Sequence, residues 1–396
     1  MPYVPYWRLS GYYFFYFAFI GVFSPYFGLY LQSLSFSAWD ISLLMTQMQL
    51  MRLVGPFFWS SLADRFGHRL RVIRLTGVVT LGVFCIFFIA RRFEVLLATM
   101  GVFAFFWVAA LPLVETLTFD HLRDDPGRYS RIRLWGSVGF VVTVLGIGGL
   151  LDWWPLVSLL WMCALCLGGI SLCGLFIPEA LVPQSHEIHP AIGHILRQPR
   201  VWALLGACFF MSAAHGALNI FYSIFLSDHG YGTSVAGGLW TLGVVAEIGV
   251  FFHMARALRR FGLRQILIAS LVAAVVRFVM IGQSLEYLVV LAMAQLLHGL
   301  TFGAFHSAAI AAVNRWFPGS TRSRGQALYS SLSFGAGGTV GGLASGWAWD
   351  HFGGEMAFAL GSLFALAGLI LVIGWVFDSD VSEKQGKSVV NGSDGV

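Results

Sequence analysis

Residues 65–69 read Arg-Phe-Gly-His-Arg, and residues 260–264 read Arg-Phe-Gly-Leu-Arg. Each stretch follows the second long apolar segment in a set of six, so the two copies are one six-segment unit apart. Five positions make a short repeat, but the shared location favours a chain built from two related halves. The repeat therefore predicts the plan of the whole fold.

The apolar segments around the repeat are long enough to cross a membrane. The chain has 396 residues, of which 58% are hydrophobic and 11% charged, a balance that indicates lipid as the solvent for much of the surface. A hydrocarbon core of roughly 30 Å needs about twenty apolar residues per helix. Runs of that length lie near 8–33, 40–63, 72–90, 94–119, 133–152, 155–177, 201–227, 234–257, 265–283, 287–313, 325–348 and 355–377. We predict an all-α integral membrane protein with twelve transmembrane helices in two pseudo-symmetric six-helix bundles.

Polar stretches divide the chain into four parts. We expect an N-terminal bundle over 1–177, a central cytoplasmic loop over 178–200, a C-terminal bundle over 201–377, and a disordered cytoplasmic tail over 378–396. Arginines cluster after the second, fourth, eighth and tenth apolar runs, and positive loops stay cytoplasmic. Both termini should therefore face the cytoplasm, and we expect a multi-pass protein of the bacterial inner membrane.

The sequence shows no motif typical of nucleic-acid binding, metal binding, catalysis or ATP use. The net charge of +5 is spread between apolar runs, which argues against nucleic acid as a partner. The five cysteines fall inside apolar runs, where packing is the usual role, and Cys163 and Cys166 have no partner ligands in sequence for a metal. No Ser-His-Asp set, phosphate loop or metal cluster stands out. We expect a monomer that is not an enzyme and uses no cofactor, metal or ATP.

Charged residues inside the first half are few, and each needs a partner or a water-filled cavity. They are Arg52, Glu115 and Arg133. Glu115 and Arg133 lie on adjacent antiparallel runs at similar depth, so their side chains can meet, either to bind a solute or as a structural ion pair. A carboxylate solute could be held bidentately by Arg52 or Arg133.

The second half carries Glu247, Arg277, His298 and His306 inside its runs. These are candidates for proton coupling, because movement of an arginine relative to a carboxylate can load and release a proton. A membrane histidine can instead form a helix-to-helix hydrogen bond.

Two further features of the second half point to a cavity and a gate. His215, Asn219 and Tyr222 share one helical face, which could line a cavity or make a polar interhelical contact. The glycine-rich run 325–348 is a candidate gating helix or a tightly packed one. Asp350 and Glu355, near the opposite membrane face, are expected to be solvated.

The segment 61–69, Ser-Leu-Ala-Asp-Arg-Phe-Gly-His-Arg, resembles the signature between helices two and three of the major facilitator superfamily. In that family the acidic and basic residues form a network that holds the cytoplasmic side shut. The resemblance implies a cytoplasmic gate made of Asp64, Arg65, Gly67 and Arg69. A plain positive-inside loop is the alternative.

A second resemblance covers residues 114–115 and 127–140, the latter reading Gly-Arg-Tyr-Ser-Arg-Ile-Arg-Leu-Trp-Gly-Ser-Val-Gly-Phe. This region is similar to the lactose permease and phenylpropionate permease branches, and residues 246–248 and 297–302 favour the latter. The resemblance implies that Glu115 and Arg133 bind the solute, with Phe140 as a stacking aromatic. His298 and Arg277 match coupling residues of lactose permease, but Thr301 stands where that protein has a glutamate.

The resemblance implies a secondary active transporter working by alternating access. Proton-coupled symport of a small organic solute is our first expectation, with an aromatic carboxylate such as phenylpropionate as the first solute to consider. A sugar or nucleoside symporter and a drug or metabolite efflux antiporter are alternatives. A non-transporting receptor would keep the cavity but show no counterflow.

Overall fold

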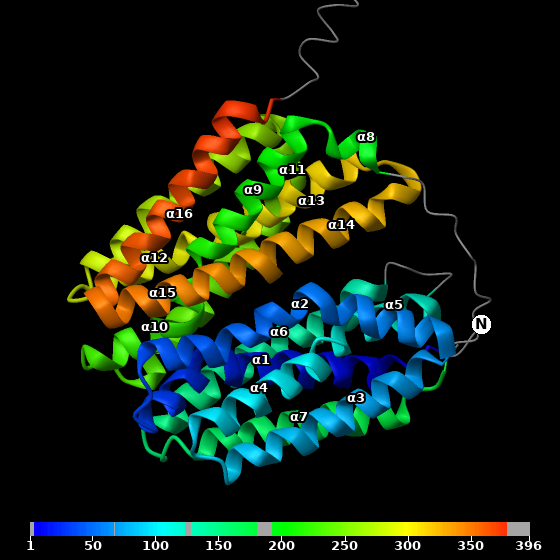
Figure 1. The fold of residues 1–396 in the computed structure, drawn as a ribbon, viewed down its shortest axis with the longest axis vertical. Coiled ribbons are helices and arrows are strands. Elements are labelled where there is room, and N and C mark those ends of the chain that lie inside the picture. Colours follow the sequence, from blue (N-terminus) through cyan, green and yellow to red (C-terminus); the bar gives the residue numbers. More distant parts are fainter. Residues whose placement is uncertain (1–3, 67, 123–127, 180–191, 378–396) are drawn as a thin grey trace, which may run out of the picture.

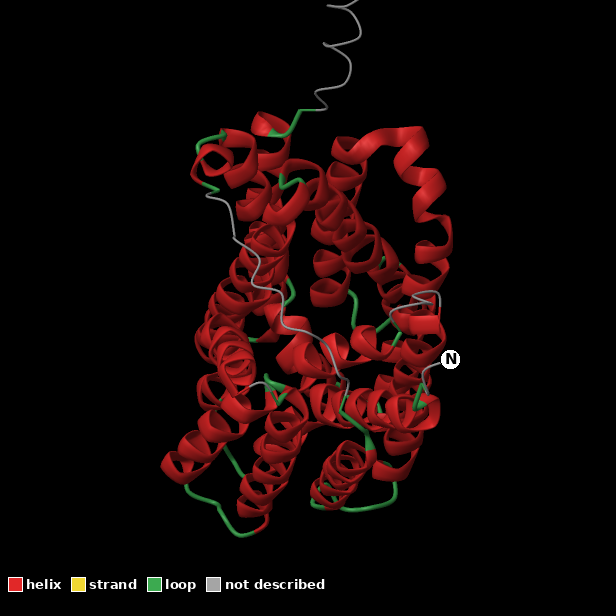
Figure 2. Ribbon diagram, turned by 90° about the vertical axis from the view of Figure 1, so that its right-hand side faces the viewer, coloured by secondary structure: helices red, strands yellow, loops and turns green. Residues whose placement is uncertain are grey.

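The computed structural model describes residues 4–66, 68–122, 128–179 and 192–377. Within these ranges every regular element is helical and no strand occurs, as the red ribbons of Figure 2 show. Asp64, Phe66 and Ser320 are described only through their backbone. The predicted tail, 378–396, and most of the predicted central loop lie outside the described residues.

The N-terminal half contains six helical rods, two of which are interrupted once. Helix α3 continues into the 3₁₀ turn η1, and α4 is followed after two residues by α5 in the same rod. The bounds are α1 (Tyr6–Ser33), α2 (Ala38–Phe66), α3 (Arg69–Phe84), η1 (Cys85–Phe88), α4 (Phe93–Trp107), α5 (Ala110–His121), α6 (Arg128–Leu151) and α7 (Ser158–Phe176).

The C-terminal half repeats this plan with more breaks. The bounds are α8 (Gly193–Leu196), α9 (Pro199–Ala214), α10 (Gly216–Asp228), α11 (Thr233–Gln283), α12 (Leu288–Leu296), η2 (Gly299–Ala304), α13 (Phe305–Trp316), η3 (Gly319–Thr321), α14 (Arg322–Ser330), η4 (Ser331–Gly337), α15 (Gly338–Phe352) and α16 (Gly354–Trp375). Short helix α8 lies in the predicted loop. Helix α11 is two rods joined at Gly262, whose φ of 75° and ψ of 171° favour glycine.

Nine helices in the described ranges are long and apolar enough to cross a membrane, counting the two rods of α11 together. The other two predicted spans correspond to the rods 38–66 and 322–352, which are not among these nine. These two are less apolar because they pack on each other across the two halves. A Cβ at Gly342 would lie 2.1 Å from Thr46, and one at Gly346 would lie 2.2 Å from Ser42. Small residues permit this close helix contact, so these faces need not suit lipid.

The two halves meet most closely at one end of the molecule. Helix α2 contacts α15, α6 contacts α11, and α1 contacts α10. Figure 1 shows these contacts near the start of α2 and the tip of α10, whereas α5 and α14 lie apart near the N-terminus. We call the first region the closed end and the second the open end. The hydrogen bonds found between described residues of the two halves lie at the closed end.

Candidate functional site

Arg277, on the second rod of α11, is fully buried in the C-terminal half. Its Nη1 donates to Nδ1 of His298 and to Oγ1 of Thr301, both at 3.0 Å. Its Nη2 donates to Oε1 of Gln295 at 3.0 Å, and Nη1 also lies 3.4 Å from Nε2 of His215. Every one of these acceptors is a neutral group. No carboxylate among them offsets the charge of the guanidinium.

The backbone around η2 brings these acceptors to Arg277. Gln295, His298 and Thr301 are three residues apart in turn, so they follow one face of the rod. The segment directly after His298 is a π-helix, a local widening that often occurs at functional sites. A Cβ at Gly299 would lie 2.8 Å from the carbonyl oxygen of Ala246, so η2 packs directly on the first rod of α11.

Glu247, on that first rod, faces the other side of His298. Its Oε2 lies 3.7 Å from Nε2 of His298. Since Nδ1 of His298 accepts from Arg277, the ring proton of a neutral His298 sits on Nε2 and points at the carboxylate. The structure thus brings together Glu247, His298 and Arg277 in one row, with the histidine between the charges. Their assignment to proton coupling stays a prediction.

His306 lies elsewhere, two helical turns beyond His298. Its Nδ1 is 2.6 Å from the hydroxyl of Tyr329 on α14. The rings of His298, Phe302 and His306 follow one another nearly parallel, with centroids 5.5 and 5.7 Å apart. The bond to Tyr329 is the helix-to-helix contact that the sequence left as an alternative.

In the N-terminal half, Glu115 and Arg133 have separate partners. The hydroxyl of Tyr129 donates to Oε1 of Glu115 at 3.2 Å. The guanidinium carbon of Arg133 lies 3.8 Å from the ring centroid of Phe17, a cation–π contact. No ion pair within 4 Å joins the two side chains in the described part of the chain. Tyr129, one turn before Arg133 on α6, is therefore the partner of the carboxylate, and Phe17 is the partner of the arginine.

Electrostatic proximity nevertheless links the charges of both halves. The hydroxyl of Tyr16 lies close enough to interact electrostatically with Arg52, Glu115 and Arg133. Glu247 interacts electrostatically with Arg133 across the interface between the halves. The charges therefore surround one central region.

Aromatic rings border this region. Tyr16 stacks on Trp107, with centroids 4.6 Å apart and planes within 2°. Phe140 is half-buried on α6, seven residues and so two turns beyond Arg133, on the same face. The guanidinium of Arg52 lies 5.9 Å from the ring of Phe334 in the other half. Aromatic rings therefore lie beside the arginines of this region.

The polar face predicted on the seventh span is mostly buried. His215 lies at the break between α9 and α10, where its Nδ1 donates to the carbonyl oxygen of Met211 at 2.8 Å. Its Nε2 is thereby free to accept from Arg277. Tyr222 is buried and its hydroxyl has no partner among the described residues, while Asn219 is half-buried. Of the three, His215 joins the Arg277 cluster.

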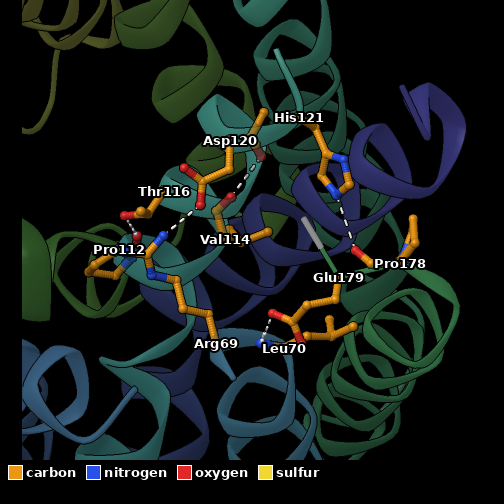
Figure 3. A network of polar contacts seen from close by, with 10 residues as sticks. Arg69, Leu70, Pro112, Val114, Thr116, Asp120, His121, Pro178 and Glu179 are labelled. Atoms are coloured by element: carbon orange, nitrogen blue, oxygen red, sulfur yellow. Dashed lines mark hydrogen bonds and ion pairs between the residues drawn. The ribbon is translucent and has the colours of Figure 1, made fainter. Parts of the chain in front are cut away.

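The predicted cytoplasmic gate lies at the open end. Figure 3 shows Arg69 donating to Asp120 of α5 at 2.5 Å, a contact within the N-terminal half. The same figure shows the carboxylate of Glu179 accepting from the backbone N–H of Leu70 at 3.2 Å. Arg65 is exposed and lines a groove of about 420 Å³ on α2, away from the central charges. Gly67 and the Asp64 side chain lie outside the described residues.

Sequence reasoning missed several partners. Gln295 could have been noticed three residues before His298 on the same face, and Tyr129 one turn before Arg133. Asp350 is exposed, as expected, but it also accepts hydrogen bonds from the backbone of α2, because the halves close on each other there. A contact between distant helices leaves no spacing signal in the chain.

Two helical bundles around a charged central region are the architecture of a major facilitator superfamily transporter. The chain matches the MFS_1 like family over residues 6–360 and belongs to that family. Members of the superfamily are membrane transporters rather than enzymes.

Individual relatives agree with this assignment. A protein of Escherichia coli (strain K12) named as a probable 3-phenylpropionic acid transporter is 27% identical over 373 residues, covering 92% of this chain and 96% of the relative. The xanthosine permease of the same organism is 22% identical over 345 residues, covering 81% of this chain and 82% of the relative. The crystal structure of the nucleoside transporter NupG has a TM-score of 0.81 at 17% identity, covering 93% of this chain and 98% of NupG.

Proposed function

We propose that the protein takes up a small organic monocarboxylate together with a proton. The observation that carries this proposal is the charge balance of the central region. Among the described residues, this region holds three arginines, Arg52, Arg133 and Arg277, and two carboxylates, Glu115 and Glu247. With the histidines neutral, one positive charge is left over. Uncompensated positive charge is costly inside a membrane, so this site favours an anionic solute over a neutral one.

The surroundings of the arginines favour an aromatic carboxylate. A guanidinium can hold a carboxylate through two hydrogen bonds. Phe17 lies directly against Arg133, and the stacked pair of Tyr16 and Trp107 lies beside the same charges. Phe140 extends the aromatic face along α6. The name of the Escherichia coli relative, a probable 3-phenylpropionic acid transporter, supports the same class of solute.

Proton coupling is assigned to the row Glu247, His298 and Arg277. When Glu247 binds a proton, the negative charge that faces Arg277 through His298 is lost. The solute carboxylate then replaces that charge in the central region. One proton and one monocarboxylate carry no net charge together, so each cycle is electroneutral. Because His298 bridges the two charges, it is the residue through which solute and proton sense each other.

The structure corresponds to an inward-facing state if both termini are cytoplasmic. The open end, with the N-terminus, then faces the cytoplasm, and the closed end faces outward in a bacterial inner membrane. In this proposal a monomer works by rocking the bundle 1–177 against the bundle 201–377. Asp64, Arg65, Gly67 and Arg69 form the gate that closes the cytoplasmic side in the opposite state.

Nucleoside uptake is the second candidate function. It is favoured by the relative named xanthosine permease and by the fold of NupG. Aromatic walls suit a nucleobase as well as a phenyl ring. The positive charge of the site separates the two proposals, because a neutral nucleoside would not replace the negative charge that Glu247 loses on protonation.

Glu247→Gln in proteoliposomes tests the coupling proposal. Solute-driven proton movement should be abolished, while exchange of labelled solute for unlabelled solute should persist, since exchange needs no net proton transfer. Normal proton movement would remove Glu247 from the mechanism. A thermal-shift comparison of 3-phenylpropionate, its amide, xanthosine and maltose identifies the solute class: only the carboxylate should stabilise the protein.

A further inference from the structure

At the closed end, a carboxylate of the C-terminal half caps a helix of the N-terminal half. Asp350, near the end of α15, accepts from the backbone N–H of Ala38 at 3.0 Å and from that of Trp39 at 2.9 Å. These are the first two residues of α2. The first N–H groups of a helix have no partner within the helix, and a carboxylate there also meets the positive end of the helix dipole.

The reciprocal cap joins the halves on the other side. Asp152 directly follows α6 of the N-terminal half. Its Oδ1 accepts from the hydroxyl of Thr233 at 2.7 Å and from the backbone N–H of Ser234 at 3.2 Å. Thr233 and Ser234 are the first two residues of α11 in the C-terminal half.

The two caps occupy equivalent places in the repeat. Asp152 and Asp350 each lie at the end of the fifth span of their half, and each binds the start of the second span of the other half. These donors are backbone amides and a hydroxyl, all of them neutral, so neither cap is a salt bridge. A carboxylate released from neutral donors is readily hydrated, which makes such a contact reversible.

We propose that Asp152 and Asp350 are paired latches that hold the closed end shut. Each cap can exist only while the two halves are together, because the carboxylate and the helix it caps belong to different halves. The caps therefore stabilise this conformation and contribute nothing to a state in which the halves have parted at this end. Interactions of that kind shift a conformational equilibrium. This role is independent of which solute is carried.

Asp40 offers a matched control for the latches. It is a carboxylate on the first turn of α2, one residue after Trp39, but it accepts from the N–H of Ser37 in its own half. Its removal changes the charge at the same place without breaking a hydrogen bond between the halves.

The test measures the separation of the halves at the closed end. Spin labels at Trp153 and Tyr287, exposed loop residues of the two halves, report the distance by double electron–electron resonance. Asp152→Ala and Asp350→Ala should each raise the ratio of parted to closed molecules by roughly three- to tenfold, the effect expected for one helix cap. The double variant should show the product of the two effects.

Conservative variants keep the test decisive if an alanine variant folds poorly. Asp152→Asn and Asp350→Asn remove the charge but retain an oxygen that can accept from the same donors. They should shift the ratio less than the alanine changes, and Asp40→Ala should leave it unchanged. The proposal would be overturned if the double alanine variant and the double asparagine variant both gave the distance distribution of the unmodified protein. An equal shift with Asp40→Ala would overturn it as well.

Discussion

The hydroxyl of Thr301 accepts a hydrogen bond of 3.0 Å from the buried guanidinium of Arg277. A carboxylate at this place would neutralise the arginine permanently. Thr301 instead accepts one hydrogen bond from Arg277 and leaves the charge of the guanidinium in place. The link from Arg277 to an acidic group runs through His298 to Glu247. Arg277 can therefore respond to the protonation of a single carboxylate.

Replacing Thr301 by valine keeps the side-chain shape but removes the acceptor. We expect the free energy of unfolding in detergent to fall by about 0.5–2 kcal/mol, the range for a polar interhelical contact. Thr99→Val is the control, because the hydroxyl of Thr99 bonds to the carbonyl of Val95 in its own helix. Equal losses in the two variants would show that the contact with Arg277 adds no stability.

Arg133→Lys tests whether the planar guanidinium of Arg133 binds the solute or only its positive charge is needed. Lysine keeps the positive charge but loses the flat guanidinium that lies on Phe17 and could hold a carboxylate with two bonds. The KM for the carboxylate solute should rise about tenfold, while the melting temperature changes little. Arg131→Lys, at an exposed position of the same helix, should leave the KM unchanged. An unaltered KM in Arg133→Lys would remove Arg133 from the solute site.

Two adjacent glycines at the closed end should respond differently to alanine. A Cβ at Gly237 would lie 2.5 Å from the hydroxyl of Tyr26 and 2.7 Å from the carbonyl oxygen of Val144, whereas one at Gly238 would meet nothing within 4 Å. Gly237→Ala should therefore push the halves apart. The expected result is a longer distance between labels at Trp153 and Tyr287, with no change in Gly238→Ala. Identical distances in both variants would contradict the close packing.

External pH should affect the latch at Asp152 only under strongly acidic conditions. Burial raises the pKa of Asp152, but hydrogen bonds from Ser234 and Thr233 outweigh it, so the pKa lies below the ordinary value of 3.8. In the parted state these bonds are lost and the pKa returns toward that value. The contribution of Asp152 to closure is therefore complete above about pH 4 and is lost as the pH falls through the lowered pKa.

The same spin-label distance checks this pH dependence. It should stay constant from about pH 8 to about pH 5 and lengthen only below about pH 4. The hydroxyl of Tyr26 also senses the charge of Asp152, but a tyrosine stays protonated throughout this range. A transition centred near neutral pH would show that another group controls the closed end.

The architecture could be predicted from the sequence because its cause is local. Runs of about twenty apolar residues must be helical in lipid, where every backbone group needs a partner. The repeat at 65–69 and 260–264 located the two halves. The break at Gly262 within α11 falls inside this repeat, and the family assignment confirms the predicted superfamily.

The partners of the charged residues could not be predicted in the same way. Depth along a helix predicted that Glu115 and Arg133 lie near each other. In the structure the hydroxyl of Tyr129 binds Glu115, and the ring of Phe17 lies against Arg133. Asp350 meets α2 through the folding of both halves, which no spacing within either half reveals. Periodicity gives the face of a helix, and the partner on the facing helix depends on the packing of the whole molecule.

Simultaneous measurement of solute and proton flux decides whether a carboxylate and a proton cross the membrane together. Proteoliposomes with an acidic exterior would contain a pH-sensitive dye and receive labelled 3-phenylpropionate outside. We expect accumulation of the carboxylate driven by the pH gradient, one proton entering per solute, and no net charge movement. Accumulation of a neutral nucleoside instead, or carboxylate uptake that leaves the internal pH unchanged and is insensitive to the gradient, would contradict the proposal.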